Sequence, residues 1–158
     1  MPRFRRDLFI GAGAALGLAC SPAPARAERP RMTAYRTPSC GCCLGWVQHM
    51  RGAGFDVRVV ELQRLGPVQR GAGVPPELEG CHVAMLGPHS FSGHVPAAAI
   101  RRFLADPGPW RGLAVPGMPL GSPGMEVEGR EPQTYEVYAY GQDGQYEPFA
   151  RARGGDLV

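Results

Sequence analysis

The sequence predicts one α/β domain with a cluster of cysteines between its first strand and its first helix. The chain has 158 residues, of which 44% are hydrophobic, enough for a single core of ordinary size. Segments of strand and helix character follow one another in the order β-α-β-α-β-β-α. Three of the five cysteines fall within Cys40-Gly41-Cys42-Cys43, directly after the first strand segment. There is no internal repeat, and nothing suggests a second domain.

The first half of the domain is expected to hold two strands and two helices. Alternating apolar and β-branched residues predict strands at 31–35 and 55–60. A Thr-Pro-Ser break precedes the first helix, 43–51, and glycines end it, so the cysteines lie at a helix N-terminus. Residues 62–73 predict a weaker helix, because a Gly-Pro pair interrupts it.

The next segment is expected to be a hairpin followed by a helix. Residues 81–86 and 90–95 have strand character and are joined by a Gly-Pro-His turn. A proline then opens a helix over 97–105, whose isoleucine, phenylalanine and leucine form one apolar stripe.

The last part of the chain is expected to add a long loop and a C-terminal β-hairpin. Residues 112–125 are rich in glycine and proline and carry Met118 and Met125, so they cannot form a regular helix. Residues 135–140 and 145–150 have strand character and flank a turn that contains Asp-Gly.

This succession of elements is thioredoxin-like, with a Cys-x-x-Cys pair at the first strand-to-helix junction. In that arrangement the third strand runs antiparallel beside the first, and the fourth strand pairs with the third. The start of the third strand, Cys81-His82, is therefore expected beside the Cys40–Cys43 segment. The end of the fourth strand should bring His94 back toward Cys81.

Residues 1–27 predict a signal peptide. Arginines near the start precede an apolar run through Cys20, and the small-residue site Ala25-Arg26-Ala27 follows, so we expect cleavage after Ala27. The pair Arg5-Arg6 fits a twin-arginine export signal, although an ordinary Sec signal also begins with arginines. An uncleaved anchor is disfavoured because the run is shorter than the roughly 20 residues that span a bilayer. Lipoprotein cleavage at Cys20 is a competing interpretation.

The mature chain, residues 28–158, is expected in the periplasm, without a membrane span. The formal charge of +3 disappears on processing, which leaves thirteen arginines and thirteen acidic residues. A nearly neutral domain has no electrostatic attraction for nucleic acid or acidic membranes. The chain has no lysine, which excludes lysine-based catalysis, and no Ser-His-Asp pattern or phosphate-binding glycine loop is discernible.

The mature cysteines allow three interpretations. In an oxidising compartment four cysteines could form two structural disulfides. The Cys40/Cys43 pair could instead serve a thiol-disulfide oxidoreductase, but Cys42 would compete for its disulfide, and Cys81-His82 stands where such enzymes hold a proline. Thiolates that converge from two segments suit a soft metal better, with Cu(I) first and Zn(II) next. Zinc sites usually show two separated ligand pairs, and closely spaced thiolates can bridge several Cu(I) ions.

The candidate metal ligands combine thiolates, an imidazole and thioethers. The set is Cys40, Cys42, Cys43, Cys81, His94, Met118 and Met125. The two methionines are included because a loop without helical periodicity gives core packing less reason to hold them.

The other histidines are weaker candidates. Strand alternation is expected to turn His82 to the face opposite Cys81. His49 lies about 10 Å along the helix from Cys42, too far to share an ion with it, and is expected at the surface. His89 falls in a turn and is expected to be solvated. Trp46, one turn beyond Cys42, is expected to shield the site from water.

Several segments of the chain occur together in one known family. They are Cys40–Cys43 with Trp46 and His49, residues 74–78, Cys81-His82, residues 93–97, residues 112–119 and residues 121–126. Together they closely resemble the CopG-type periplasmic copper-resistance proteins, long catalogued as domain of unknown function 411. The resemblance extends from Tyr35 to about Ala150 and is most specific in the methionine-containing loop.

The resemblance implies a thioredoxin-like periplasmic domain that binds copper through its cysteines and contributes to copper tolerance, with or without Cu(I)/Cu(II) redox chemistry. Other periplasmic copper-handling proteins are the partners that it implies. The family's cysteines fall on Cys40, Cys42, Cys43 and Cys81, and its Gly-His and Gly-Met motifs fall on His94, Met118 and Met125. The chain departs from the family in its second helix, where Gly66, Pro67 and Gly71 weaken a more regular segment.

Overall fold

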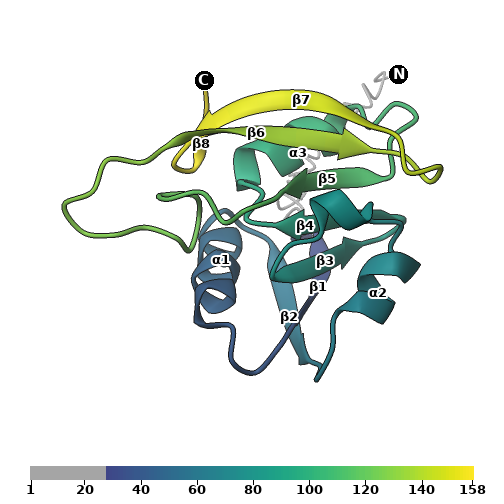
Figure 1. Cartoon of the computed structure of the whole chain (residues 1–158), viewed down its shortest axis with the longest axis horizontal. Coiled ribbons are helices and arrows are strands. Elements are labelled where there is room, and N and C mark those ends of the chain that lie inside the picture. Colours follow the sequence, from purple (N-terminus) through teal and green to yellow (C-terminus); the bar gives the residue numbers. More distant parts are fainter. Residues whose placement is uncertain (1–27) are drawn as a thin grey trace, which may run out of the picture.

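The computed structural model describes residues 28–158, which form one mixed α/β domain around an eight-stranded sheet (Figure 1). The predicted signal peptide, residues 1–27, lies outside the described residues. In residues 28–158 no helix is long and apolar enough to cross a membrane. The elements in chain order are β1 (Arg31–Arg36), α1 (Gly41–Gly52), β2 (Asp56–Glu61), α2 (Gly66–Gly71), the 3₁₀ helix η1 (Pro76–Leu78), β3 (His82–Leu86), β4 (His89–Gly93), α3 (Ala97–Ala105), β5 (Gly112–Val115), β6 (Thr134–Tyr140), β7 (Tyr146–Arg153) and β8 (Asp156–Leu157).

The sheet has the strand order β2-β1-β3-β4-β5-β6-β7-β8. Strand β1 runs parallel to β2 and antiparallel to β3, and β4 runs antiparallel to β3 and parallel to β5. The remaining neighbours are antiparallel. Arg36 at the end of β1 is paired with His82 at the start of β3, which confirms that the Cys81-His82 segment lies beside the end of the first strand.

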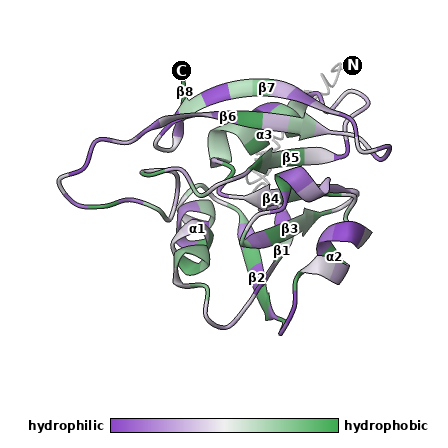
Figure 2. Cartoon of the chain, viewed as in Figure 1, coloured by the Kyte–Doolittle hydropathy of each residue, from purple (hydrophilic) through white to green (hydrophobic). Residues whose placement is uncertain are grey.

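Helices cover the sheet on two faces. On one face α1 and α3 pack against the sheet in the larger hydrophobic cluster, which includes Trp46, Phe91 and Phe103. On the other face α2 and η1 cover a smaller cluster that includes Val83 and Tyr140. Figure 2 shows hydrophobic residues along α1 and the central strands and hydrophilic residues on α2. Burying each large apolar side chain contributes on the order of 2 kcal/mol, so both faces stabilise the frame that carries the site.

Two predicted elements, the second helix and the loop at 112–125, differ from the structure. The second helix is shorter than expected and covers only Gly66–Gly71. The Gly-Pro pair that was expected to interrupt it instead begins it, because proline is tolerated in the first turn of a helix. The predicted loop 112–125 begins as strand β5, which lies buried between β4 and β6. A four-residue strand is too short to show the alternation of apolar and polar residues that identifies a strand. Gly112 allows β5 to lie close to its neighbours, because a Cβ there would clash with the carbonyl oxygen of Ser90 and lie 2.8 Å from the hydroxyl of Tyr140.

Strands β6 and β7 pair antiparallel across the turn at 141–145, with a register shift between Val137 and Tyr138. Strand β8 pairs with β7 and was not expected from the sequence, because it contains two residues. The helix predicted over 97–105 has the observed bounds of α3.

Candidate metal centre

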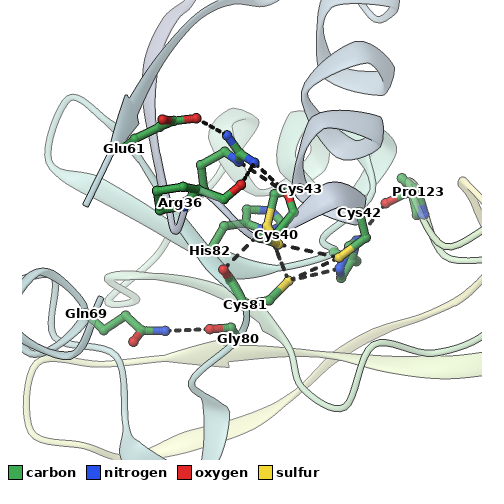
Figure 3. Close-up of a disulfide and its surroundings, with 12 residues drawn as sticks. Arg36, Cys40, Cys42, Cys43, Glu61, Gln69, Gly80, Cys81, His82 and Pro123 are labelled. Atoms are coloured by element: carbon green, nitrogen blue, oxygen red, sulfur yellow. Dashed lines mark hydrogen bonds and ion pairs between the residues drawn. A yellow bond between two sulfur atoms is a disulfide. The ribbon is translucent and has the colours of Figure 1, made fainter. Parts of the chain in front are cut away.

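Arg36 holds the loop that leads to the cysteines. It is the last residue of β1 and only 4% exposed. Its guanidinium donates hydrogen bonds to the carbonyl oxygens of Cys40 at 2.9 Å and Pro38 at 3.0 Å, and it pairs with the carboxylate of Glu61 on β2 (Figure 3). Cys40 is the N-cap of α1 and has no side-chain cap of its own. The buried arginine therefore fixes the start of α1, a function that the sequence pattern did not indicate.

Four cysteine sulfurs meet at the N-terminus of α1. Cys40 and Cys43 form a disulfide, and Cys42 and Cys81 are free thiols. The Sγ atom of Cys42 lies 3.5 Å from that of Cys40 and 3.9 Å from that of Cys81, and the Sγ atoms of Cys43 and Cys81 are 3.7 Å apart. All four lie within 4.8 Å of one another. The predicted convergence of the four residues is confirmed, but two of them are joined to each other.

Helix geometry explains this choice of disulfide. Residues three apart in a helix lie on the same face, so Cys43 returns to the side of the N-cap residue Cys40. Their Cα atoms are 5.6 Å apart, within the range that a disulfide spans. Cys43 is 1% exposed, whereas Cys40 and Cys42 are partly exposed.

Polar contacts on the other side of the site hold Cys81 in place. Gln69 of α2 donates to the carbonyl oxygen of Gly80 at 2.8 Å, and the amide of Gly80 donates to the hydroxyl of Ser92 at 2.9 Å. Both side chains are buried. Gly80 also packs against the backbone of Gly93, where an added Cβ would lie 2.5 Å from the Cα atom. No local sequence pattern indicated these supports, because they depend on contacts between distant segments.

Two histidines face the thiol of Cys81. The Nε2 atom of His94 lies 3.1 Å from Sγ of Cys81, and Nδ1 of His94 donates to the carbonyl oxygen of Pro123 at 2.8 Å. The Nδ1 atom of His82 lies 3.4 Å from the same sulfur. These three residues form a second group with possible metal-ligand spacing.

The expectation that His82 faces away from Cys81 was wrong. Strand β3 begins at His82, so Cys81 precedes the strand and strand alternation does not apply to the pair. The ring of His82 packs between Trp46, at 4.5 Å between ring centroids, and His94, at 5.1 Å. Its Nε2 atom is buried and has no hydrogen-bond partner.

Burial keeps the groups around Cys81 neutral. Desolvation is the main cause that raises the pKa of Cys81 to about 12, and the neighbouring Cys42 is the second. Desolvation, followed by the neighbouring His94, lowers the pKa of His82 to about 3, and desolvation also lowers the pKa of His94. Neutral imidazole is the form that binds metals, and a soft cation would displace the thiol proton.

The long loop after β5 closes over α1. A Cβ added to Gly124 would lie 2.5 Å from both the carbonyl oxygen of Cys42 and the amide nitrogen of Trp46, and Gly124 has a φ of +88°. Glycine is therefore required for this contact. The expected covering role of Trp46 fits its position, because its side chain is fully buried and its indole N–H donates to the carbonyl oxygen of Val95 at 2.8 Å.

The two loop methionines are placed less closely. Met118 is 47% exposed, and Met125 is partly buried next to Gly124. In residues 28–158 the close sulfur and imidazole contacts described above join only cysteines and histidines. Ligation by Met118 and Met125 stays a prediction.

Two other histidines depart from their expected surface positions. His49 is partly buried and its Nε2 atom accepts a hydrogen bond from the amide of Ala97 at 3.1 Å, which satisfies a free donor at the start of α3. Desolvation lowers its pKa. His89 is partly buried, and its ring stacks edge-on against Phe103 because it belongs to β4 rather than to the preceding turn.

The donor set fits a soft metal ion. The sulfur atoms of Cys40, Cys42, Cys43 and Cys81 lie within 4.8 Å of one another. The imidazole of His94 contacts the sulfur of Cys81. No carboxylate belongs to either ligand group in the described part of the chain. Sulfur-rich sets of this kind favour Cu(I) over hard cations such as Mg²⁺ or Ca²⁺.

Comparisons with known proteins agree with this chemistry. The family model described as "Protein of unknown function, DUF411" matches residues 78–125, which contain Cys81, His94 and both loop methionines. No curated protein matches the chain.

Two solved structures match the chain, and both bear the name copper resistance protein CopG. Form 1 is 35% identical, has a TM-score of 0.74 and aligns over 80% of this chain and 100% of its own. Form 2 is 35% identical, has a TM-score of 0.73 and aligns over 79% and 99%. The chain therefore belongs to the CopG copper-resistance family.

Proposed function

We propose that the protein is a periplasmic copper-binding protein that holds Cu(I) in a multi-cysteine site and serves copper handling or resistance. The observation that carries the proposal is the convergence of four cysteine sulfurs within 4.8 Å, with the Nε2 atom of His94 beside one of them. The name that the two similar structures bear supports copper as the ligand. In the dithiol form the four thiolates could bridge more than one Cu(I) ion.

The proposal also includes a thioredoxin-like core, export, and ligands from the loop. The β2-β1-β3-β4 order, with α1 directly after β1 and the cysteines at its start, supports the first. The sequence pattern of residues 1–27 supports export to the periplasm. The contact of Gly124 with α1 supports a loop that covers the site, from which Met118 and Met125 would supply thioether ligands.

An anaerobic Cu(I) titration of the reduced protein tests the proposal. Substitution Cys81→Ser should lower the Cu(I) affinity by at least about tenfold, because Cys81 contacts Cys42, Cys43 and His94. His49→Gln is a matched control in the same domain, since His49 bonds to α3 rather than to the cluster. Circular dichroism would show that both variants are folded. Unchanged binding by Cys81→Ser would contradict the four-thiol site.

One observation favours a second function, that of a periplasmic thiol-disulfide oxidoreductase. The Cys40–Cys43 disulfide joins a partly exposed residue, Cys40, to a buried one, Cys43, as an exchanging pair requires. This function predicts turnover of a disulfide substrate by the metal-free protein. Turnover should depend on Cys40 and Cys43 and be indifferent to Cys42→Ser. Loss of turnover in Cys42→Ser, or no turnover by the unaltered protein, would argue against it.

A further inference from the structure

The cysteine cluster divides into two parts when the disulfide is closed. Cys40 and Cys43 are consumed by their bond, whereas Cys42 and Cys81 remain thiols, with 3.9 Å between their Sγ atoms. The Nε2 atom of His94 is 3.1 Å from Cys81. Closure of the disulfide therefore leaves the thiol of Cys81 in contact with a second thiol, Cys42, and with the imidazole of His94.

The hydrogen bond of His94 fixes the nitrogen that faces these thiols. The carbonyl oxygen of Pro123 can only accept, so Nδ1 of His94 carries the proton, and Nε2 presents its lone pair to Cys81. Pro123 lies in the loop that Gly124 anchors to α1, so the orientation of the ring is set by the fold. His94 is fully buried, which prevents water from replacing that contact.

The two separations measured from Cys81 suit a single three-coordinate ion. With metal–sulfur bonds of about 2.3 Å and metal–nitrogen bonds of about 2.0 Å, trigonal ligands lie about 4 Å apart. The Sγ atoms of Cys42 and Cys81 already lie 3.9 Å apart, and Nε2 of His94 lies 3.1 Å from Sγ of Cys81. Cys42 and His94 belong to different ligand groups, so their side chains would have to turn toward a shared ion. Cu(I) accepts such low coordination with thiolate and imidazole ligands.

We infer that the Cys40–Cys43 pair is a redox latch that sets how many Cu(I) ions the protein holds. With the latch open, four thiolates and His94 share a multinuclear site. With the latch closed, Cys42, Cys81 and His94 retain one ion. This inference rests on the proposed function and adds a means of regulation to it.

Closure of the latch is a thiol-disulfide exchange that oxidises Cys40 and Cys43 by two electrons. Cys40, a partly exposed residue, loses its proton, and its thiolate attacks a disulfide donor, such as a low-molecular-weight disulfide, and expels one donor thiolate, which takes up a proton. Cys43 then attacks the Cys40 sulfur of the mixed disulfide and expels the second. The two cysteines lose two electrons and two protons, which the donor gains as two thiols, and any copper held by the pair leaves as Cu(I).

The test compares copper capacity in the two redox states of the full chain. Protein oxidised with glutathione disulfide, and shown to have two titratable thiols fewer than reduced protein, is titrated anaerobically with Cu(I) against bicinchoninate. We expect about one tightly bound Cu(I) for the oxidised protein and at least about two for the reduced protein. The double variant Cys40→Ser/Cys43→Ser should bind about one ion in either state, because it retains only the closed-latch ligands.

Two matched variants identify the retained ligands in the oxidised protein. His94→Gln should weaken Cu(I) binding by at least about tenfold, whereas His89→Gln, whose ring lies against Phe103, should not. Equal capacity in both redox states, or no binding by the oxidised protein, would overturn the latch while reduced protein still binds copper. No tight binding by reduced protein would instead refute the proposed function itself.

Discussion

Acid should destabilise the metal-free protein, because His82 stays neutral in the fold and takes up a proton in the unfolded chain. The pKa of this residue is lowered from 6.5 to about 3, chiefly by burial, and its side chain is 1% exposed. Above pH 6.5 the residue is neutral in both folded and unfolded chains and contributes no pH dependence. Below that pH the unfolded chain takes up a proton that the folded protein refuses until the pH falls near 3.

The free energy of unfolding should therefore fall by about 1.4 kcal/mol for each pH unit in that window. Between about pH 7.5 and about pH 5, His82 alone should remove about 2 kcal/mol, because pH 5 lies about 1.5 units below its unfolded pKa. His94 and His49, whose pKa values are also lowered, act in the same direction.

Urea unfolding at the two pH values would measure this loss. In His82→Phe the ring against Trp46 is kept and the titration is removed, so the pH-dependent loss should be smaller than in the unaltered protein by about 2 kcal/mol. Val83→Ala is the control, because Val83 lies next to His82 and is also fully buried but does not titrate. This substitution should lower the free energy of unfolding by the same amount at both pH values. If His82→Phe loses as much stability on acidification as the unaltered protein, His82 is not neutral in the fold and the reasoning is wrong.

Three further substitutions probe the supports of the site. Gly124→Ala should lower the free energy of unfolding by more than about 2 kcal/mol, because its Cβ would meet α1, while Gly129→Ala, with a φ of +71° and open space, should cost only the left-handed strain of about 1–2 kcal/mol. Arg36→Met should lower the free energy of unfolding by about 1–3 kcal/mol, because two loop carbonyls lose their hydrogen-bond donor. Arg58 is exposed, so Arg58→Met should leave the free energy of unfolding almost unchanged in the same urea titration. Trp46→Phe should cost about 1–3 kcal/mol, because it leaves a buried carbonyl without its indole donor, and a stability equal to that of the unaltered protein would contradict the importance of this bond.

Elements with a strong local pattern were predictable from the sequence. The 97–105 helix has its observed bounds because a proline and an apolar stripe define it locally. Strand β5 was missed because its four residues become a strand only by pairing with β4 and β6. The second helix was predicted too long, because its apolar residues do not reveal where Gly66–Gly71 ends.

The site was predictable in its cysteines and His94, but not in its details. His82 joins the group because β3 begins one residue later than the sequence pattern indicated. The supports from Arg36, Gln69 and Ser92 were missed, because a buried polar side chain has no signature in its own segment.

By itself the sequence determined that a Cys-Gly-Cys-Cys segment begins a helix after the first strand and that Cys81 and His94 return to it. Residue type and element order carry that information. Only the tertiary structure decided which sulfurs are joined and which nitrogen of His94 faces them. Those choices depend on distances of a few ångströms between segments, such as the contact of the Pro123 carbonyl with His94. The division into a disulfide pair and three retained donors therefore became visible only in the fold.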